Sequence, residues 1–454
     1  MKKDKIIILS LATLIGTSSI LNGVSYTVFA QENTNVVMKN SSENENKKIG
    51  TENNKKNVSS SDIESKKSKT IYVKTAASSS GNGTENNPYN DFKTAYSIAN
   101  EGDTIVLLNT VTIQNDDNSS DAGVFTFKKS IKITGIGSQS CLTSRVPIQL
   151  ESNVTLENTE LSTPKIYLNG YELNMNNVKR NMNNREKPTV YGGSHQGTKK
   201  TGAKSSLIVT GSVQNPFEFK AIYAGSDTGE SNVGVSIQLN SGVKVEQGVN
   251  ASGSTGKVNA NVEFVIGNVN VNKFENTYNT ANTNIDFKGY TNTNGPFIEG
   301  YKDVKLENSN ITVDADKEFT GLSGKLELTG NSKLDISKNN STFSIQELVA
   351  NNGSIIVLNK DNGILDVKSG FTGNIEFRTP GSADQSTSGP VKLDWSYIKA
   401  DKTSTGKVTF KPNNTQPNVV ITTDETSNLK EWKVIEKKIT NPIATLEVEG
   451  SKKV

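Results

Sequence analysis

The stretch Thr70–Ile113 decides the fold, and it reads TIYVKTAASSSGNGTENNPYNDFKTAYSIANEGDTIVLLNTVTI. It begins with a short β-like run, passes through a turn rich in Ser, Gly and Asn, and ends in further β-like runs. Between them, apolar residues recur at i, i+3, i+4 and i+7, the spacing of one helix face: Phe92, Ala95, Tyr96 and Ala99. The stretch therefore predicts a strand, a helix and then strands.

Both ends of this helix carry signals. Asn90 or Asp91 offers an N-cap side chain, and Gly102 offers the helix stop. Strand-like runs then continue almost to the C-terminus. A single helix before such an array predicts a cap over the open end of a β stack, with Phe92 and Tyr96 in the core rather than in a site.

The rest of the chain has the composition of a repetitive β architecture. Aromatic residues make up 6% of the sequence, which contains 37 Gly but only 11 Pro. Short alternating runs of apolar and polar residues, separated by turn residues, predict strands throughout. These runs begin at Val154, Ile166, Leu207, Val235, Val262, Val304, Leu326, Ile355, Ile375, Val408 and Ala444.

Internal repeats indicate stacked coils. The segment Val190–Gly197 realigns with Ile222–Gly229 and, more loosely, with Val249–Gly256, at offsets of 222 − 190 = 32 and 249 − 222 = 27 residues. A second pair of similar segments is Leu156–Leu161 and Leu306–Ile311. This period favours a solenoid. The alternative, a series of β-sandwich modules, would show a repeat of about 100 residues.

The order strand, Gly/Asn loop, Pro88-Tyr89, short helix, Gly102-Asp-Thr-Ile105 and strand carries a resemblance. It resembles the N-terminal entry of right-handed parallel β-helix proteins of the pectate-lyase-like superfamily, which includes secreted and surface proteins of Gram-positive bacteria. The match covers only Thr70–Ile113. With the repeats, it predicts an all-β fold, a right-handed parallel β-helix solenoid with one N-terminal capping helix.

Four segments are expected along the chain. Residues 1–30 read as a signal peptide, with a Lys-rich start, an apolar middle and a cleavage site of small residues after Ala30. Residues 31–68, rich in Asn, Lys, Glu and Ser, predict a disordered linker. Residues 69–390 are the expected parallel β-helix, and residues 391–454 a C-terminal β cap or small β unit. The expected localisation is extracellular and cell-surface associated.

Asparagines at equivalent turns of a β-helix can stack and hydrogen-bond the adjacent coil. The candidates for such a ladder are Asn158, Asn169, Asn240 and Asn308.

Metal and thiol chemistry have little support. Cys141 and His195 are the only cysteine and histidine, which excludes a zinc site with the usual ligands. Cys141 is expected to be a small buried residue. The densest acidic spot, Asn115–Asn118 with Asp121, is expected to be a solvated loop; a loose calcium contact is the alternative, and no other cofactor is expected.

Catalysis on a glycan needs paired carboxylates, or a cation with a strong base. Between Asp121 and Asp286 the sequence holds one aspartate, Asp227, so no catalytic residue is predicted. The resemblance would imply a Gly-His-Gly segment in hydrolases, but here the histidine stands as Ser194-His195-Gln196. Carboxylates that fold together across coils remain the alternative.

A binding role has more support. Tyr191 and Tyr223 occupy equivalent repeat positions and are expected to form an exposed row that suits the apolar faces of sugars, with His195 close to the first. Lys199 and Lys200 could attract an acidic glycan. Alternatively, the tyrosines pack beneath loops.

The sequence thus favours a secreted, non-catalytic, adhesin-like protein that binds carbohydrate or cell-envelope components. A polysaccharide lyase or glycoside hydrolase is the second hypothesis, and a passive structural stalk is the third. No motif indicates nucleic-acid binding, and no stretch after the signal reaches the length of a membrane span.

Overall fold

The structure is a computed structural model. It describes residues 68–75, 81–114, 123–181, 186–196, 203–292, 295–313, 322–338, 342–351, 353–357, 364–367, 371–378, 391–394, 398–400, 405–411, 419–422, 432–440 and 443–450. These residues belong to one compact unit, Lys66–Val454. The predicted signal peptide and almost all of the predicted linker lie outside the described residues.

One helix, α1 (Phe92–Ile98), precedes an array of strands. The strands of a 21-stranded main sheet are β1 (Thr70–Val73), β2 (Thr104–Leu107), β5 (Ile131–Gly135), β8 (Val154–Glu157), β11 (Glu172–Asn176), β14 (Lys204–Thr210), β15 (Phe217–Phe219), β17 (Gly234–Val245), β19 (Val262–Val271), β21 (Thr283–Lys288), β22 (Thr291–Asn292), β24 (Asp303–Glu307), β25 (Asn310–Thr312), β26 (Lys325–Thr329), β27 (Lys333–Asp335), β29 (Glu347–Ala350), β30 (Ile355–Val357), β32 (Phe371–Arg378), β35 (Thr405–Lys411), β37 (Trp432–Thr440) and β38 (Ile443–Gly450).

The other strands form smaller sheets. An eight-stranded sheet contains β4 (Phe125–Phe127), β7 (Ile148–Leu150), β10 (Lys165–Tyr167), β13 (Thr189–Tyr191), β16 (Ala221–Tyr223), β18 (Val249–Asn250), β20 (Lys273–Glu275) and β23 (Phe297–Ile298). A four-stranded sheet contains β3 (Thr110–Ile113), β6 (Cys141–Ser144), β9 (Glu160–Ser162) and β12 (Lys179–Arg180). A three-stranded sheet contains β28 (Thr342–Ile345), β31 (Ile364–Val367) and β34 (Ile398–Ala400), and a two-stranded sheet contains β33 (Val391–Asp394) and β36 (Val419–Thr422).

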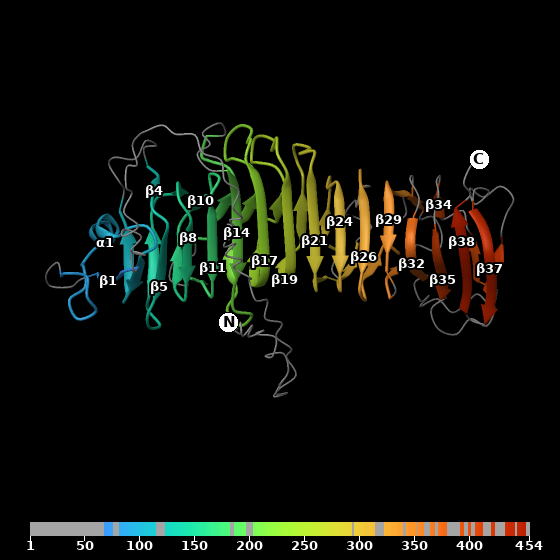
Figure 1. The fold of residues 1–454 in the computed structure, drawn as a ribbon, viewed down its shortest axis with the longest axis horizontal. Helices are drawn as coiled ribbons and strands as arrows, with labels where there is room; N and C mark the ends of the chain where they lie inside the picture. The colour runs from blue at the N-terminus through green and yellow to red at the C-terminus, as the bar shows by residue number, and fades with distance from the viewer. Residues whose placement is uncertain are drawn as a thin grey trace, which may run out of the picture. The chain divides into compact units, whose positions relative to one another are not determined.

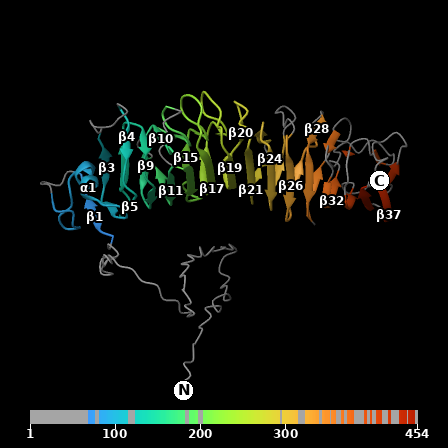
Figure 2. The same cartoon turned by 45° about the horizontal axis from the view of Figure 1, so that its top comes forward.

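From β4 to β23, each coil adds one strand to the main sheet and one to the eight-stranded sheet, and the added strands pair in parallel with those of the previous coil. Among the described residues after β23, the coils add strands to the main sheet but none to the eight-stranded sheet. Figure 1 shows the main-sheet strands side by side, and Figure 2 shows β4, β10 and β20 along a separate side. The predicted all-β parallel β-helix solenoid is confirmed. All of the predicted strand runs lie in strands.

The coil length varies more than the repeats predicted. In the main sheet, Leu156 pairs with Met175 and Met175 with Val209, which gives coils of 175 − 156 = 19 and 209 − 175 = 34 residues. The predicted period of 27 to 32 residues is therefore correct for the repeated segments and wrong for the shorter coils. In longer coils, such as the one between β14 and β17, the additional residues lie in loops between strands.

Alternation along each strand fills the interior. In β21, Ile285 and Phe287 are buried, while Asp286 and Lys288 point outward. Phe287 meets Phe274 of the eight-stranded sheet at 5.1 Å between ring centroids, so side chains from two sheets close the core. Each such buried side chain contributes about 1.5–3 kcal/mol.

Helix α1 covers the first coil as predicted. Asp91 is the N-cap, and its side chain accepts a hydrogen bond from the Thr94 backbone N–H at 2.7 Å. The ring of Phe92 meets Phe125 of β4 at 5.9 Å. The predicted stop at Gly102 is wrong, because the helix ends at Ile98 and Ala99 forms the C-cap.

The turn after many main-sheet strands is left-handed, and asparagine or glycine occupies it. These positive-φ residues are Asn158, Asn177, Gly289, Asn308 and Gly330. Only Gly and, less readily, Asn adopt this conformation at low cost. The Asn158 side chain accepts a hydrogen bond from the Asn177 side chain at 2.8 Å, one coil away.

The predicted single asparagine ladder is wrong, although each candidate bonds an adjacent coil. Asn308 accepts from the Asn331 backbone at 3.3 Å in the turn column. Asn169 lies in a different turn and donates to the Leu150 carbonyl at 3.0 Å. Asn240 lies within β17 and donates to a threonine of β14 at 2.8 Å. The four asparagines therefore occupy three different structural positions: the turn column, a second turn and the interior of a strand.

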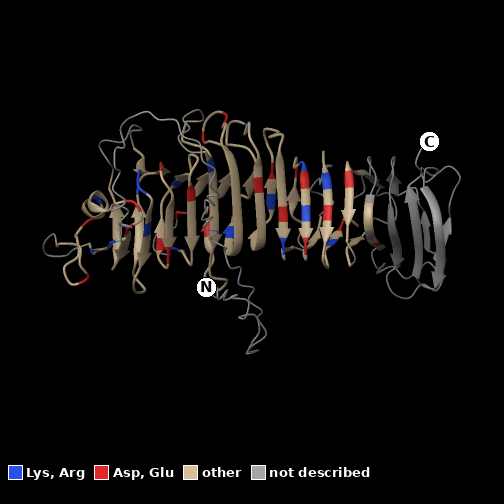
Figure 3. Ribbon diagram, in the orientation of Figure 1, with Lys and Arg blue, Asp and Glu red and all other residues tan. Residues whose placement is uncertain are grey.

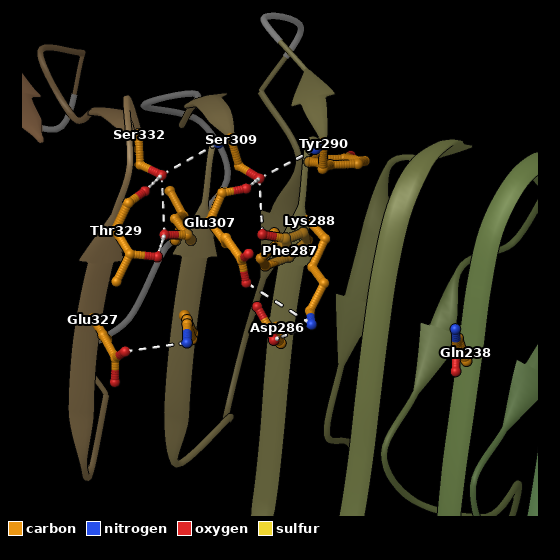
Figure 4. A network of polar contacts seen from close by, with 12 residues as sticks. Gln238, Asp286, Phe287, Lys288, Tyr290, Glu307, Ser309, Glu327, Thr329 and Ser332 are labelled. Atoms are coloured by element: carbon orange, nitrogen blue, oxygen red, sulfur yellow. Dashed lines mark hydrogen bonds and ion pairs between the residues drawn. The ribbon is translucent and has the colours of Figure 1, made fainter. Parts of the chain in front are cut away.

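Inside the turns, buried serines replace missing ladder hydrogen bonds (Figure 4). The Ser309 hydroxyl donates to the Phe287 carbonyl at 2.8 Å and accepts from the Tyr290 N–H at 3.1 Å. One coil on, the Ser332 hydroxyl donates to the Leu306 carbonyl at 2.9 Å and accepts from the Ser309 N–H at 3.2 Å. Each serine satisfies backbone groups that the turn would otherwise leave unpaired.

Near the C-terminus the pairing changes. Strand β36 still pairs in parallel with β33, and β35 with β32, but β38 pairs antiparallel with both β35 and β37. An antiparallel hairpin therefore follows the last parallel coil. In the described part of the chain, no helix is long and apolar enough to cross a membrane.

Candidate functional site

Three tyrosines of the eight-stranded sheet form a stacked row, here called the tyrosine row. Register places Tyr167 of β10 beside Tyr191 of β13, and Tyr191 beside Tyr223 of β16. The ring centroids lie 5.4 Å and 5.3 Å apart. The predicted pairing of Tyr191 with Tyr223 is confirmed. Tyr167 was missed, although a β-branched residue precedes all three tyrosines and would have identified it.

The tyrosine row is mostly covered. Tyr167 is fully buried, Tyr191 is 5% exposed, and only Tyr223 is partly exposed. The predicted exposure of Tyr191 is therefore wrong. Loops after β13, β16 and β18 stack on one another through bridges such as that between Gln196 and Thr228, and they carry polar residues over the rings.

Asp227, in the loop after β16, reaches back across two coils to the tyrosine row. Its Oδ2 atom accepts hydrogen bonds from Lys165 Nζ at 2.6 Å and from the Tyr167 hydroxyl at 2.8 Å. The Ser254 hydroxyl donates to its backbone carbonyl and lies 3.4 Å from Oδ1. Lys165 also lies over the Tyr191 ring, at 5.6 Å from the centroid.

The hydrogen bonds that Asp227 accepts keep its carboxylate ionised. Burial alone would raise its pKa, but the hydrogen bonds from Lys165 and Tyr167 outweigh burial and hold the pKa below its usual value. Burial and the Asp227 charge raise the pKa of Tyr191. The carboxylate stays ionised with its donors in place, and the phenol stays protonated. This arrangement ties a loop to the sheet and leaves little capacity for proton transfer.

His195 was predicted to lie close to Tyr191, and its ring contact is with the neighbouring Tyr167. Its ring lies 5.4 Å from that of Tyr167, and its Nδ1 atom is buried without a hydrogen-bond partner among the described residues. Lys199 and Lys200 lie outside the described residues. Their predicted attraction for an acidic glycan stays a prediction.

The open edge of the row, here called the tyrosine margin, consists of Tyr223 and Tyr278. Tyr278 is 41% exposed, and its hydroxyl donates to the Ser254 carbonyl at 3.2 Å. Burial and the nearby Glu275 carboxylate raise the pKa of Tyr223, and the Tyr278 phenol acts in the same direction. Glu275 pairs with Lys273 at 2.7 Å. Sequence reasoning missed Tyr278, because it lies in a turn and not at the repeat position.

Other reactive groups are inert or outside the described residues. Cys141 is buried as predicted; burial raises the pKa of its thiol to about 11, and the Asn181 amide lies 3.0 Å from its sulfur. Within the described ranges, no group of three His, Cys, Asp or Glu side chains is placed to hold a metal ion. The acidic segment Asn115–Asn118, with its calcium alternative, falls outside those ranges.

Comparison with known proteins gives no relative: no protein-family model matches the chain, and no curated protein or solved structure is similar to it. The resemblance of the N-terminal stretch to the pectate-lyase-like superfamily therefore stays a prediction. Any functional conclusion depends on this chain's own residues.

Proposed function

We propose that this is a secreted, non-catalytic, adhesin-like protein that binds carbohydrate or cell-envelope components through the tyrosine margin. One observation carries the proposal: Tyr278 is an exposed aromatic side chain, close enough to the partly exposed Tyr223 for its phenol to help raise the pKa of Tyr223. Tyrosine rings offer an apolar face to a sugar and a hydroxyl for hydrogen bonding. The neighbouring Lys273 and Glu275 add charged groups at the same edge.

The hydrogen bonds that occupy the Asp227 carboxylate support a binding role rather than catalysis. A glycosidase needs a second carboxylate at a fixed separation, and a lyase needs a base that can take a proton. Asp227 keeps its lone pairs on Lys165 and Tyr167. The enzyme hypothesis therefore remains second, and the test below includes it.

The test is Tyr278→Ala in the mature protein, compared with Ile136→Ala, which truncates another exposed apolar side chain. Binding to a panel of neutral and acidic polysaccharides is measured by affinity electrophoresis, and polymer length by size-exclusion chromatography. Loss of one stacking ring should weaken binding about tenfold, equivalent to about 1.4 kcal/mol, while Ile136→Ala leaves it unchanged.

Three outcomes would contradict the proposal. Shortened polymers would establish an enzyme and overturn the non-catalytic role. Equal binding by Tyr278→Ala and the unmodified protein would remove the tyrosine margin from the ligand site. Absence of binding to any polymer or to isolated cell envelopes would favour the passive stalk.

A further inference from the structure

A groove of about 580 Å³ lies at the end of the main-sheet strands β17 and β19, and none of the tyrosine-margin residues lines it. We call it the asparagine groove. Its lining residues come from four successive coils: Val213, Pro216, Ser241, Gly242, Val243, Asn268, Val269, Asn270, Asn272, Thr291 and Asn292. Adjacent parallel strands lie about 4.8 Å apart, so four coils span about 14 Å along the stack.

At and beside the groove, glycines allow the backbones of adjacent coils to approach closely. Gly242 has a φ of +61°, and a Cβ atom there would lie 2.3 Å from the Gly211 backbone of the previous coil. A Cβ atom on Gly267 would likewise lie 2.0 Å from the Asn240 carbonyl oxygen. The close approach of the coils leaves no room for a side chain at these two positions, and one of them, Gly242, lines the groove.

The lining is entirely uncharged, in a chain in which 21% of residues are charged. Asn268 and Asn270 are exposed, and neither side chain makes a hydrogen bond within the described part of the chain. Asn272 and Asn292 pair with each other at 2.9 Å. Amides that both donate and accept suit hydroxyl groups, and Val213 supplies an apolar wall.

One row of outward residues on the adjoining sheet face is also uncharged beside the groove, although the same face carries the ion pair of Lys204 and Glu263 at 2.9 Å. In this row the register-equivalent residues are uncharged in β11, β14, β17 and β19, and charged in β21, β24 and β26. In order they are Asn174, Ile208, Gln238 and Val265, then Asp286, Lys305 and Glu327.

Figure 3 shows the alternating charges on β21, β24 and β26, and Figure 4 shows Gln238 apart from the network that contains Asp286, Lys288 and Glu307. The charged side chains pair among themselves: Lys305 Nζ lies 3.2 Å from Glu327, and Lys288 Nζ lies 3.6 Å from Asp286. They therefore leave no unbalanced field to attract an ionic ligand.

We infer that the asparagine groove binds an uncharged polysaccharide segment laid across the coils. A charged polymer would lose hydration against a lining that contains no ion to pair with it, whereas neutral hydroxyl groups can exchange water for the amides of Asn268 and Asn270. The charge beside the lining, on Lys244, the register partner of Asn270, interacts with the Glu218 carboxylate. This inference does not rest on the tyrosine margin, because the two sites share no residue and use different chemistry.

The test is the double substitution Asn268→Asp with Asn270→Asp, which keeps side-chain shape and adds charge to the groove. The control is Asn261→Asp, an exposed asparagine directly before the other end of the same strand. Affinity electrophoresis compares a neutral glucan and a neutral mannan with a polygalacturonate. The double variant should bind the neutral polymers about tenfold or more weakly, and the control should bind them like the unmodified protein.

Preferred binding of the polygalacturonate by the unmodified protein, or equal neutral-polymer binding by the double variant and the control, would overturn the inference. A Tyr278→Ala arm separates the two sites, because loss of binding in that arm alone assigns the polymer to the tyrosine margin. If the double variant loses its far-UV circular dichroism, the single substitution Asn270→Ala replaces it with the same expected direction.

Discussion

Removing the charge of Asp227 should release the loop that it ties to the tyrosine row. In Asp227→Asn the Tyr167 hydroxyl keeps an acceptor, but Lys165 loses its carboxylate partner at 2.6 Å. The Asp227 side chain is 14% exposed, and a hydrogen bond to a buried charge contributes about 1.5–3 kcal/mol. Lys165 is 39% exposed and regains water, which lowers the net cost to about 2 kcal/mol.

The assay is hydrogen exchange of the loop 224–233, read by mass spectrometry on the folded protein. A local loss of about 2 kcal/mol corresponds to about 30-fold faster exchange in this loop. Glu157→Gln is the matched control. Glu157 also pairs with a lysine, Lys132, at 2.6 Å, but its side chain is 25% exposed and makes a surface pair of about 0–1 kcal/mol.

The effect should depend on pH in one direction. Because the folded-state pKa of Asp227 lies below the unfolded value of about 3.9, its contribution is complete above that value. It disappears as the pH falls through the folded pKa, where the protonated side chain resembles asparagine. Equal exchange in Asp227→Asn and Glu157→Gln at neutral pH would refute the reasoning, and so would a difference from the unmodified protein that persists in acid.

Two further substitutions test the coil architecture. Ser332→Ala should lower the free energy of unfolding, measured by urea titration, by about 1–3 kcal/mol, because the buried Ser309 N–H loses its acceptor. The control is Thr143→Ala, which removes the exposed hydrogen bond between the Thr143 and Thr112 hydroxyls and should change the free energy of unfolding by less than about 0.5 kcal/mol. Asn158→Gly should be tolerated, whereas Asn158→Ala, at a φ of +50°, should lower the melting temperature through about 1–2 kcal/mol of backbone strain; an alanine variant as stable as the glycine variant would contradict the left-handed turn.

The fold was predictable because its signals are local. The alternation in runs such as Val235–Leu239 fixes which side chains face the interior, and Asp91 fixes the start of the helix. The variable coil length was not predictable, since loops of any length can join strands that pair in register. Only the segments with a repeated residue pattern, which begin at Val190, Ile222 and Val249, revealed their offsets.

The candidate site was predictable only in part, for a different reason. Alignment of the repeats identified Tyr191 and Tyr223, but their burial depends on loops that the alignment did not place. One of these loops carries Asp227, which bonds Tyr167 although the two residues are 60 positions apart in the sequence. The asparagine groove has no signature in the sequence at all. Its residues are common polar types, and only the stacking of four coils places them around one hollow.

The two surfaces suggest a division of roles along one scaffold. At the tyrosine margin, Tyr278 offers an aromatic face beside the Lys273–Glu275 pair, whereas the asparagine groove offers amides without charge. The asparagine groove is lined by residues of four successive coils. Affinity for a polymer can therefore grow with the number of coils it crosses, without any single strong contact. A solenoid of this kind suits a repetitive ligand better than a small molecule, and this is the physical reason to test polymers first.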